Sequence, residues 1–242
     1  TTLIPGLLEV LARNNNFHSE AASLYELARI YIPDENLENL PEERKMLAFG
    51  FYGEGDYYAL KGMTDNIIDF AGLKNVRYVA DSEQPTFHPG RCAVITARGG
   101  REVVGVLGEI HPTVGANYGF SAPVYVAYMN VDKLFELSDM TKQYKALPKY
   151  PATTRDFSFV CDKSLEAASV EDVMKKAGGK LVEKVELFDV YTGEKIGLDN
   201  KSVAFRVTMR AADHTLTDEE ADKTSQKILA SLEKNLGITL RR

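Results

Sequence analysis

The sequence predicts an α+β fold in two domains, each an antiparallel sheet with flanking helices. Three observations predict this. In residues 1–140, strand-like runs dominate, and most neighbouring runs are close enough in sequence to form hairpins. Residues 138–151 lack hydrophobic periodicity and contain two prolines, which is typical of a linker. The residues after them show strand and helix patterns in the order βαββαβ.

The first domain begins with a predicted helix over residues 4–12, which has Pro5 in its first turn and stops at a run of asparagines. Apolar residues at helical spacing predict a second helix over residues 59–71. Gly99 and Gly100 separate two short strand-like runs and predict a hairpin turn. The predicted strands are 24–32, 46–52, 92–97, 103–107 and 124–131, with a short helical stretch after Pro112.

The second domain opens with a strand in which apolar and polar residues alternate, as in a half-buried strand. Ser169 and Asp172 are predicted to cap the helix that follows. The last helix begins at Thr217 with Glu220 three residues on, which is the pattern of a capping box. The predicted strands are 156–161, 185–191, 202–210 and 238–240, and the first helix covers 169–177. This order predicts a ferredoxin-like domain.

In a ferredoxin-like domain both helices pack on one face of the sheet, and the other face stays open. Alternation along the strand 202–210 directs Ser202, Arg206 and Arg210 to the open face. The opposite positions, which are predicted to be core, are Val203, Phe205, Val207 and Met209. The open face is therefore expected to be polar and to carry two arginines.

In the preceding strand, 185–191, the simplest pairing places Phe188 and Val190 in the core. Asp189 and Tyr191 then lie on the open face, beside the polar residues of the neighbouring strand. An exposed tyrosine next to hydrogen-bonding groups on an open sheet is how single-stranded bases are held in other proteins.

The composition is that of a soluble globular protein, with 44% hydrophobic and 26% charged residues. No apolar run reaches the ~18 residues needed to span a membrane, and no secretory signal is visible. Cys92 and Cys161 lie in apolar, strand-like surroundings, which favours reduced core thiols and a cytoplasmic location. The missing initiator methionine predicts that the chain is cut from a longer protein.

The net charge of −6 is unevenly distributed. Basic and acidic residues balance over residues 148–242, so the excess negative charge lies in residues 1–147. If the chain binds RNA, its C-terminal part is the electrostatically favourable place.

Several motifs in the second domain resemble the ferredoxin-fold anticodon-binding domain of phenylalanyl-tRNA synthetases. These are residues 150–158, 187–193, 201–206 and 215–220, and the ending Leu240-Arg241. Three more motifs resemble the synthetase-like module of the bacterial β subunit in that family. They are residues 24–31, 87–91 and 105–112. The resemblance covers nearly the whole chain.

The resemblance implies a class II synthetase-like antiparallel sheet over residues 1–140, a linker at 141–150 and the anticodon-binding domain over 151–242. In this family the enzyme is an (αβ)₂ heterotetramer that uses ATP and Mg²⁺, and the α subunit forms the phenylalanyl adenylate. The β module has lost the chemistry and acts as a scaffold for α. Residues 115–120 agree with this, because they lack the ATP-binding arginine of active class II enzymes. We therefore expect no catalytic residue and no cofactor in this part of the ligase.

The resemblance also implies a binding site for tRNA-Phe. The family reads the first anticodon base, a guanine, with an Asp, a Tyr and a Ser, which fall by motif position on Asp189, Tyr191 and Ser202. A carboxylate accepts hydrogen bonds from the guanine edge, a tyrosine ring stacks, and a hydroxyl donates or accepts. Arg206 and Arg210, placed by strand alternation alone, are candidates for contacts to phosphate or base.

The sequence leaves two other functions to consider. The same folds can serve as a non-catalytic module that binds a small molecule or a protein. Whether Asp189, Tyr191 and Ser202 share an exposed face distinguishes this from RNA binding. A self-sufficient enzyme would need the missing arginine. Arg155 and Asp156 are equally well explained as a structural ion pair at the start of a strand.

A metal site at His88, Cys92 and His111 is not expected, because the spacing fits no standard zinc pattern and a fourth ligand is missing. Histidine–proline pairs that mark turns explain His88 and His111 better.

Overall fold

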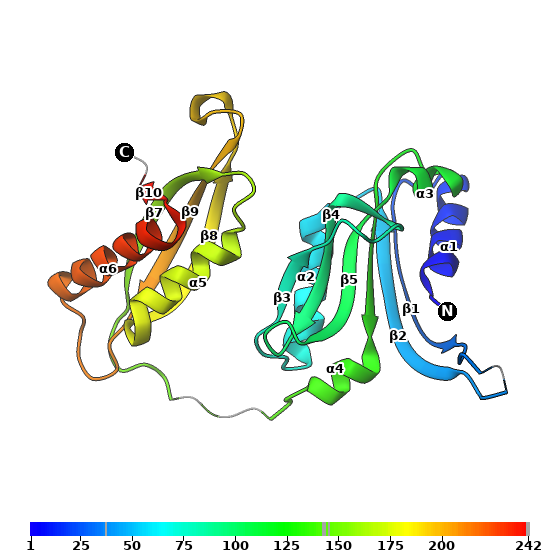
Figure 1. Cartoon of the computed structure of the whole chain (residues 1–242), viewed down its shortest axis with the longest axis horizontal. Coiled ribbons are helices and arrows are strands. Elements are labelled where there is room, and N and C mark those ends of the chain that lie inside the picture. The colour runs from blue at the N-terminus through cyan, green and yellow to red at the C-terminus, as the bar shows by residue number, and fades with distance from the viewer. Residues whose placement is uncertain (37, 142–143, 145, 241–242) are drawn as a thin grey trace. The chain divides into compact units, whose positions relative to one another are not determined.

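The computed structural model describes residues 1–36, 38–141, 144 and 146–240. It divides into two compact units, Thr1–Gln143 and Tyr144–Arg242 (Figure 1). Residues 142, 143 and 145 of the predicted linker, and Arg241 of the last quoted motif, lie outside the described residues. The domain bounds taken from the sequence stay a prediction.

The first unit is a six-stranded antiparallel sheet with helices on both faces (Figure 1). Its elements are α1 (Ile4–Asn16), β1 (Ala22–Ile32), β2 (Glu42–Tyr52), α2 (Tyr57–Phe70), β3 (Arg77–Ala80), β4 (Phe87–Ala97), β5 (Glu102–Ile110), α3 (Pro112–Asn117), β6 (Val124–Asn130) and α4 (Val131–Leu137). The strand order is β1-β2-β6-β5-β4-β3, and every paired neighbour is antiparallel.

Two hydrophobic cores lie on the two faces of this sheet. On one face α1 buries Leu8 and Leu11, which belong to a cluster that includes Val126 of β6. On the other face Leu60 of α2 and Leu134 of α4 belong to a second cluster. Each of these helices has one apolar side that must be buried against another surface. Because they pack on opposite faces, the sheet is covered on both sides.

The second unit is a four-stranded antiparallel sheet in the order β10-β7-β9-β8. Its elements are β7 (Thr153–Asp162), α5 (Ala167–Gly178), the 3₁₀ turn η1 (Gly179–Leu181), β8 (Val182–Tyr191), the 3₁₀ turn η2 (Glu194–Ile196), β9 (Asn200–Met209), α6 (Asp218–Leu236) and β10 (Thr239–Leu240). The predicted βαββαβ order is confirmed, and so is the α+β class.

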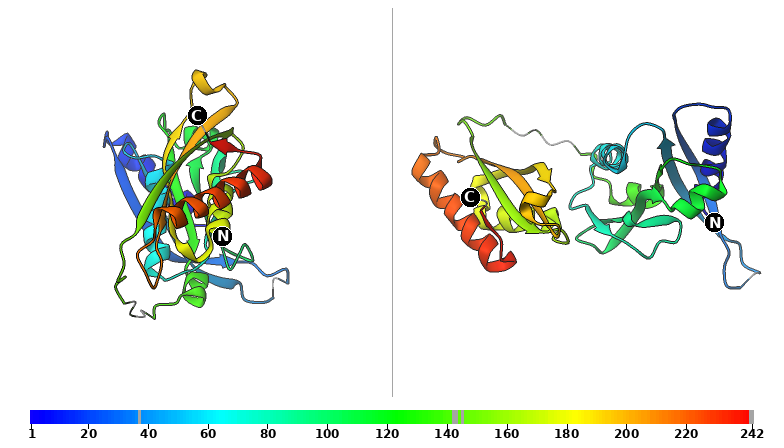
Figure 2. Two further views of the ribbon diagram at one scale, coloured as in Figure 1. Left: turned by 90° about the vertical axis from the view of Figure 1, so that its left-hand side faces the viewer. Right: turned by 90° about the horizontal axis from the view of Figure 1, so that it is seen from above.

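Both helices of the second unit lie on the same face of its sheet (Figures 1 and 2). Met174 of α5 and Leu232 of α6 are fully buried in one cluster with Phe159 of β7 and Phe205 of β9. The opposite face carries no element in the described part of this unit. The sequence predicts the site residues on this open face.

The helix starts differ in how well the sequence predicted them. The capping box at α6 is confirmed, because Thr217 Oγ1 accepts from the Glu220 N–H at 3.3 Å and the Glu220 carboxylate accepts from the Thr217 N–H at 3.0 Å. The predicted cap at Ser169 is wrong. Helix α5 begins two residues earlier and has Glu166 at its N-cap without a side-chain cap bond, so Ser169 lies inside the first turn.

No helix in the described part of the chain is long and apolar enough to cross a membrane.

Candidate nucleic-acid interface

Cross-strand register decides which side chains share the open face of the second unit. Directly opposed residues of an antiparallel pair point to the same side. Ser202 of β9 lies opposite Tyr191 of β8, and Ala204 lies opposite Asp189. Since Val203 and Phe205 alternate with these positions and are buried under the helices, Asp189, Tyr191 and Ser202 all belong to the open face.

A β-bulge in β8 changes the expected position of Phe188. Leu187 pairs with Phe205 and Asp189 pairs with Ala204, so Phe188 is the extra residue without a partner in the register. Its ring contacts the guanidinium of Arg206, with 5.3 Å between Cζ and the ring centroid. The prediction that Phe188 lies in the core is therefore wrong, because the bulge turns it to the open face.

Val190 is on the core side of β8, opposite Val203, as predicted. It is nevertheless 50% exposed. The reason is that the ends of β8 and β9, with η2 between them, extend beyond α5 and α6 (Figure 1). This projecting end of the sheet is also where Tyr191 lies.

Tyr191 and Asp189 are both exposed, and Tyr191 retains 40% of its accessible surface. The Tyr191 ring lies against the backbone two residues on, since a Cβ added at Gly193 would be only 2.3 Å from Tyr191 Oη. An exposed ring beside a carboxylate offers one surface for stacking and one acceptor for hydrogen bonds.

Ser202 differs from the expectation that it is exposed. Its side chain faces the open side but retains only 4% of its accessible surface. Ser202 lies on a central strand between its larger cross-strand partners, Val160 and Tyr191, which explains the burial. Its hydroxyl lies 3.4 Å from the hydroxyl of Ser158.

The two arginines have different environments. Arg206 faces Asp156 across the strands and forms a two-point ion pair with it, Nε–Oδ1 at 2.8 Å and Nη2–Oδ2 at 2.7 Å. The hydrogen-bonded guanidinium holds the pKa of the Asp156 carboxyl below its usual value. Arg210 forms an ion pair with Glu183 at 2.7 Å and donates to the carbonyl of Tyr150.

Distance along β9 separates Arg210 from the other candidates. It is eight residues from Ser202, which corresponds to roughly 26 Å in an extended strand. Arg206 lies about halfway between them. The structure therefore brings Asp189, Tyr191 and Ser202 together, places Arg206 beside them and holds Arg210 at the far end of the strand.

The predicted alternative of an Arg155–Asp156 pair is wrong. Arg155 lies on the core side of β7, opposite Val207, and its guanidinium contacts Asp218 at 2.9 Å and Asp222 at 3.2 Å at the start of α6. Because successive residues of a strand point to opposite faces, Asp156 is directed to Arg206 instead.

His88 lies within β4, not in the expected turn, and His111 is the N-cap of α3. His88 Nδ1 accepts from the Gly90 N–H at 3.0 Å, and His111 Nδ1 caps α3 by accepting from the Thr113 N–H at 3.2 Å. Among the residues with described positions, no group of three or more His, Cys, Asp and Glu side chains is arranged to hold a metal ion.

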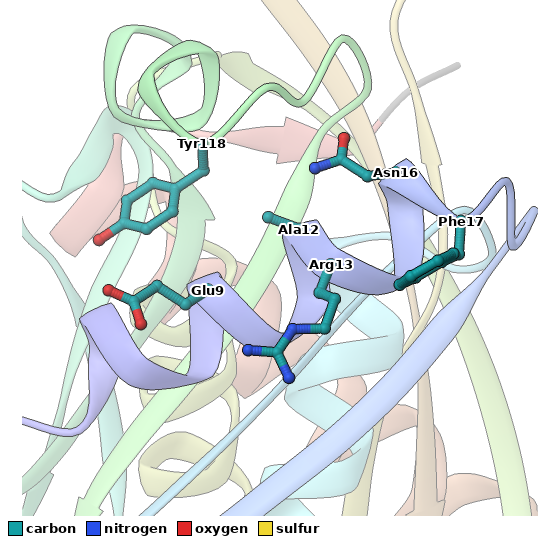
Figure 3. Close-up of a pocket in the computed structure, with 6 residues that line it drawn as sticks. All are labelled: Glu9, Ala12, Arg13, Asn16, Phe17 and Tyr118. Carbon is teal, nitrogen blue, oxygen red and sulfur yellow. The ribbon is translucent and has the colours of Figure 1, made fainter.

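The first unit contains a hollow of about 410 Å³ beside α1 (Figure 3). Glu9 and Arg13 of α1 and the ring of Tyr118 line it, together with Ala12, Asn16 and Phe17. None of the predicted site residues contributes to it, and no pattern in the sequence pointed to it.

The chain combines a helix-covered antiparallel module with a ferredoxin-like domain that has an open, partly aromatic sheet face. This combination is that of a synthetase-type chain. Comparison with known proteins gives the family. Residues 1–131 match the phenylalanyl tRNA synthetase beta chain CLM domain, and residues 148–241 match the ferredoxin-fold anticodon binding domain. The chain belongs to the phenylalanyl-tRNA synthetase beta chain family.

Curated relatives agree along the whole chain. Proteins named phenylalanine–tRNA ligase beta subunit from Clostridium acetobutylicum and Clostridium tetani are 41% and 42% identical over 241 residues. The relative of that name from Symbiobacterium thermophilum is 36% identical over 253 residues. These matches cover 100% of this chain and 28–30% of the relatives, so the chain spans less than a third of their length.

A solved pyrrolysyl-tRNA synthetase from Desulfitobacterium hafniense matches 55% of this chain and 47% of its own, with 14% identity and a TM-score of 0.45. That similarity is too low to add to the assignment.

Proposed function

We propose that this chain is the part of phenylalanine–tRNA ligase, an enzyme of protein biosynthesis, that binds the anticodon region of tRNA-Phe. The observation that carries the proposal is the shared open face of Asp189 and Tyr191, both exposed, in the unit that matches an anticodon-binding domain. The placement of Ser202 directly opposite Tyr191 supports it further.

The chemistry of these groups suits a guanine at the first anticodon position. The Tyr191 ring stacks on the base, and the Asp189 carboxylate accepts hydrogen bonds from the N1–H and N2–H₂ edge. Ser202 is buried, so a base reaches its hydroxyl only after neighbouring side chains move. We therefore assign the first contacts to Asp189 and Tyr191, with Ser202 and Arg206 in supporting roles. Arg210 is assigned no contact with the same base, because it lies at the far end of β9.

In this proposal the first unit performs no chemistry of its own. It serves as a scaffold for the α subunit in an (αβ)₂ heterotetramer, where adenylate formation with ATP and Mg²⁺ takes place. Exposed apolar side chains on one side of the edge strand β1 support a protein partner. They are Tyr25, Leu27 and Tyr31.

The proposed compartment is the cytoplasm. Cys92 and Cys161 are both free thiols buried in the cores, which is the usual state of cysteine in a reducing compartment.

The proposal is tested by titrating the full chain with the anticodon stem-loop of tRNA-Phe at low salt. Tyr191→Ala and Asp189→Asn are compared with wild type, and a second stem-loop carries adenine in place of the first anticodon guanine. Tyr58→Ala is the matched control, because Tyr58 is 75% exposed in the first unit and outside the proposed site. We expect Tyr191→Ala to weaken binding by about 1–3 kcal/mol.

The other outcomes separate the alternatives. If every protein binds both stem-loops equally, charge alone holds the RNA and the residue assignments fail. If wild type does not bind even at low salt, the same folds serve as an interaction module for a small molecule or a protein.

A further inference from the structure

We propose that Phe188 is a second base-stacking platform on the open face, with its ring held in place by Arg206. The ligand is a second, unpaired nucleobase of the same RNA, so this inference rests on the proposed function and adds a residue to it. The bulge that exposes Phe188 is the feature that points to this role.

The bulge has a specific effect on the open face. Bulges are frequent beside binding sites because they redirect a side chain that regular pairing would send the other way. Here the redirected side chain is a phenylalanine that keeps 53% of its accessible surface. A large apolar ring placed on a polar face is what single-stranded nucleic-acid sites use, since every base has a π-face to stack on it.

Arg206 and Asp156 hold the ring from the side of β9. The guanidinium of Arg206 lies 5.3 Å from the centroid of the Phe188 ring, which is within the range of a cation–π contact. Arg206 is itself fixed by the two-point ion pair with Asp156. An arginine fixed in this way keeps its guanidinium beside the ring, so Arg206 and Asp156 act as positioning residues.

Phe188 does not belong to a continuous apolar patch of the kind that binds another protein. Leu187 and Val190 are also exposed, but they pair with Phe205 and Val203 and so lie on the core side of the strand. Phe188 lies on the opposite side, with Tyr191. About 10 Å of strand separates these two aromatic positions, so the proposal assigns a separate base to each ring.

The test uses the full chain and anticodon stem-loops that carry 2-aminopurine at one loop position at a time, because stacking on an aromatic ring quenches its fluorescence. Wild type is expected to quench two different loop positions. Phe188→Ala should remove one of these signals, Tyr191→Ala the other, and each should weaken binding about 5- to 150-fold. Phe188→Tyr should restore quenching, and Asp156→Asn should reduce it at the Phe188 position alone.

Leu187→Ala is the matched control, since Leu187 is 42% exposed on the other side of the same strand. It should change neither signal, and thermal unfolding shows which variants remain folded. If Tyr191→Ala weakens binding while Phe188→Ala changes nothing, this inference is overturned and the proposed function stands. If Phe188→Ala removes only the signal that Tyr191→Ala removes, Phe188 merely supports Tyr191 and the second platform is overturned. If wild type binds no stem-loop, both proposals fall together.

Discussion

Tyr191 and Gly193 fit together so closely that only a glycine leaves room for the ring. A Cβ added at Gly193 would lie 2.3 Å from Tyr191 Oη and 2.7 Å from Cζ. The backbone of Gly193 is extended, with φ at −173°, so any residue can adopt it without strain. The close approach of the ring is therefore what requires glycine here.

Gly193→Ala is expected to displace the Tyr191 ring and to weaken binding of the anticodon stem-loop, by up to the amount that Tyr191→Ala loses. Stability should change little, because the ring lies at the surface and can move away. Gly62→Ala is the control, since a Cβ there has nothing within 4 Å. Unchanged RNA affinity in Gly193→Ala would mean that the observed position of the ring is not the binding position.

Thr217→Ala is expected to lower the free energy of unfolding by about 1 kcal/mol, because it removes the side-chain acceptor at the start of α6. Ser169→Ala, the same kind of change near the start of α5, should cause no loss, since Ser169 lies inside the helix and caps nothing. Chemical denaturation of both variants checks this. A loss of similar size in Ser169→Ala would show that the start of α5 is wrongly placed.

His214 is expected to make stability depend on pH. Its imidazole hydrogen-bonds to Asp213 at 2.7 Å and to Glu220 at 3.1 Å, and these contacts, Asp213 first, raise its pKa above the usual 6.5. Because the folded-state pKa is the higher one, the stabilisation is fully present below about pH 6.5 and is lost as pH rises through the folded value.

His214→Gln should remove this pH dependence. Melting temperatures of wild type and variant, measured between about pH 6 and pH 8, provide the comparison. The wild-type curve should fall more steeply on the alkaline side. Parallel curves would show that the His214 contacts do not persist in solution.

Binding of RNA to the open face is expected to depend only weakly on salt. The cations Arg206 and Lys184 on the open face form ion pairs with Asp156 and with Glu186 at 2.7 and 2.6 Å, and Arg210, just past β9, pairs with Glu183 at 2.7 Å. Each neutralised phosphate adds about 0.7 to the slope of log K against log salt for a single strand. A slope shallower than about −1.5 is therefore expected, and one steeper than about −3 would locate the main contacts on another surface.

Strand alternation predicted most of the open face from the sequence but failed at a single position. Val203, Phe205, Val207 and Met209 are all buried, as expected. Phe188 is not, because a bulge shifts the alternation by one residue and the apolar run around it has no feature that marks the shift. A bulge of this kind changes only which residues pair across the sheet. The local sequence around Phe188 therefore does not reveal it.

Other differences have equally local causes. The four-residue strand β3 is too short for its periodicity to be recognised. Helix α4 follows β6 directly, with Asn130 ending the strand and capping the helix through an N–H of Lys133 at 3.0 Å, so no glycine or proline separates the two elements. The burial of Ser202 depends on the sizes of Val160 and Tyr191 on the flanking strands, which the sequence of β9 alone does not contain.

The two buried cysteines are divided evenly between the two units. Cys92 belongs to the core of the first unit and Cys161 to the core of the second. Burial raises the pKa of the Cys92 thiol to about 11 and also raises that of Cys161, so neither reacts readily while its core is closed. The rate at which each thiol is modified therefore reports how often the core around it opens. Alkylation rates of the two thiols, followed by peptide mass spectrometry, would measure the opening of each unit separately without any engineered cysteine.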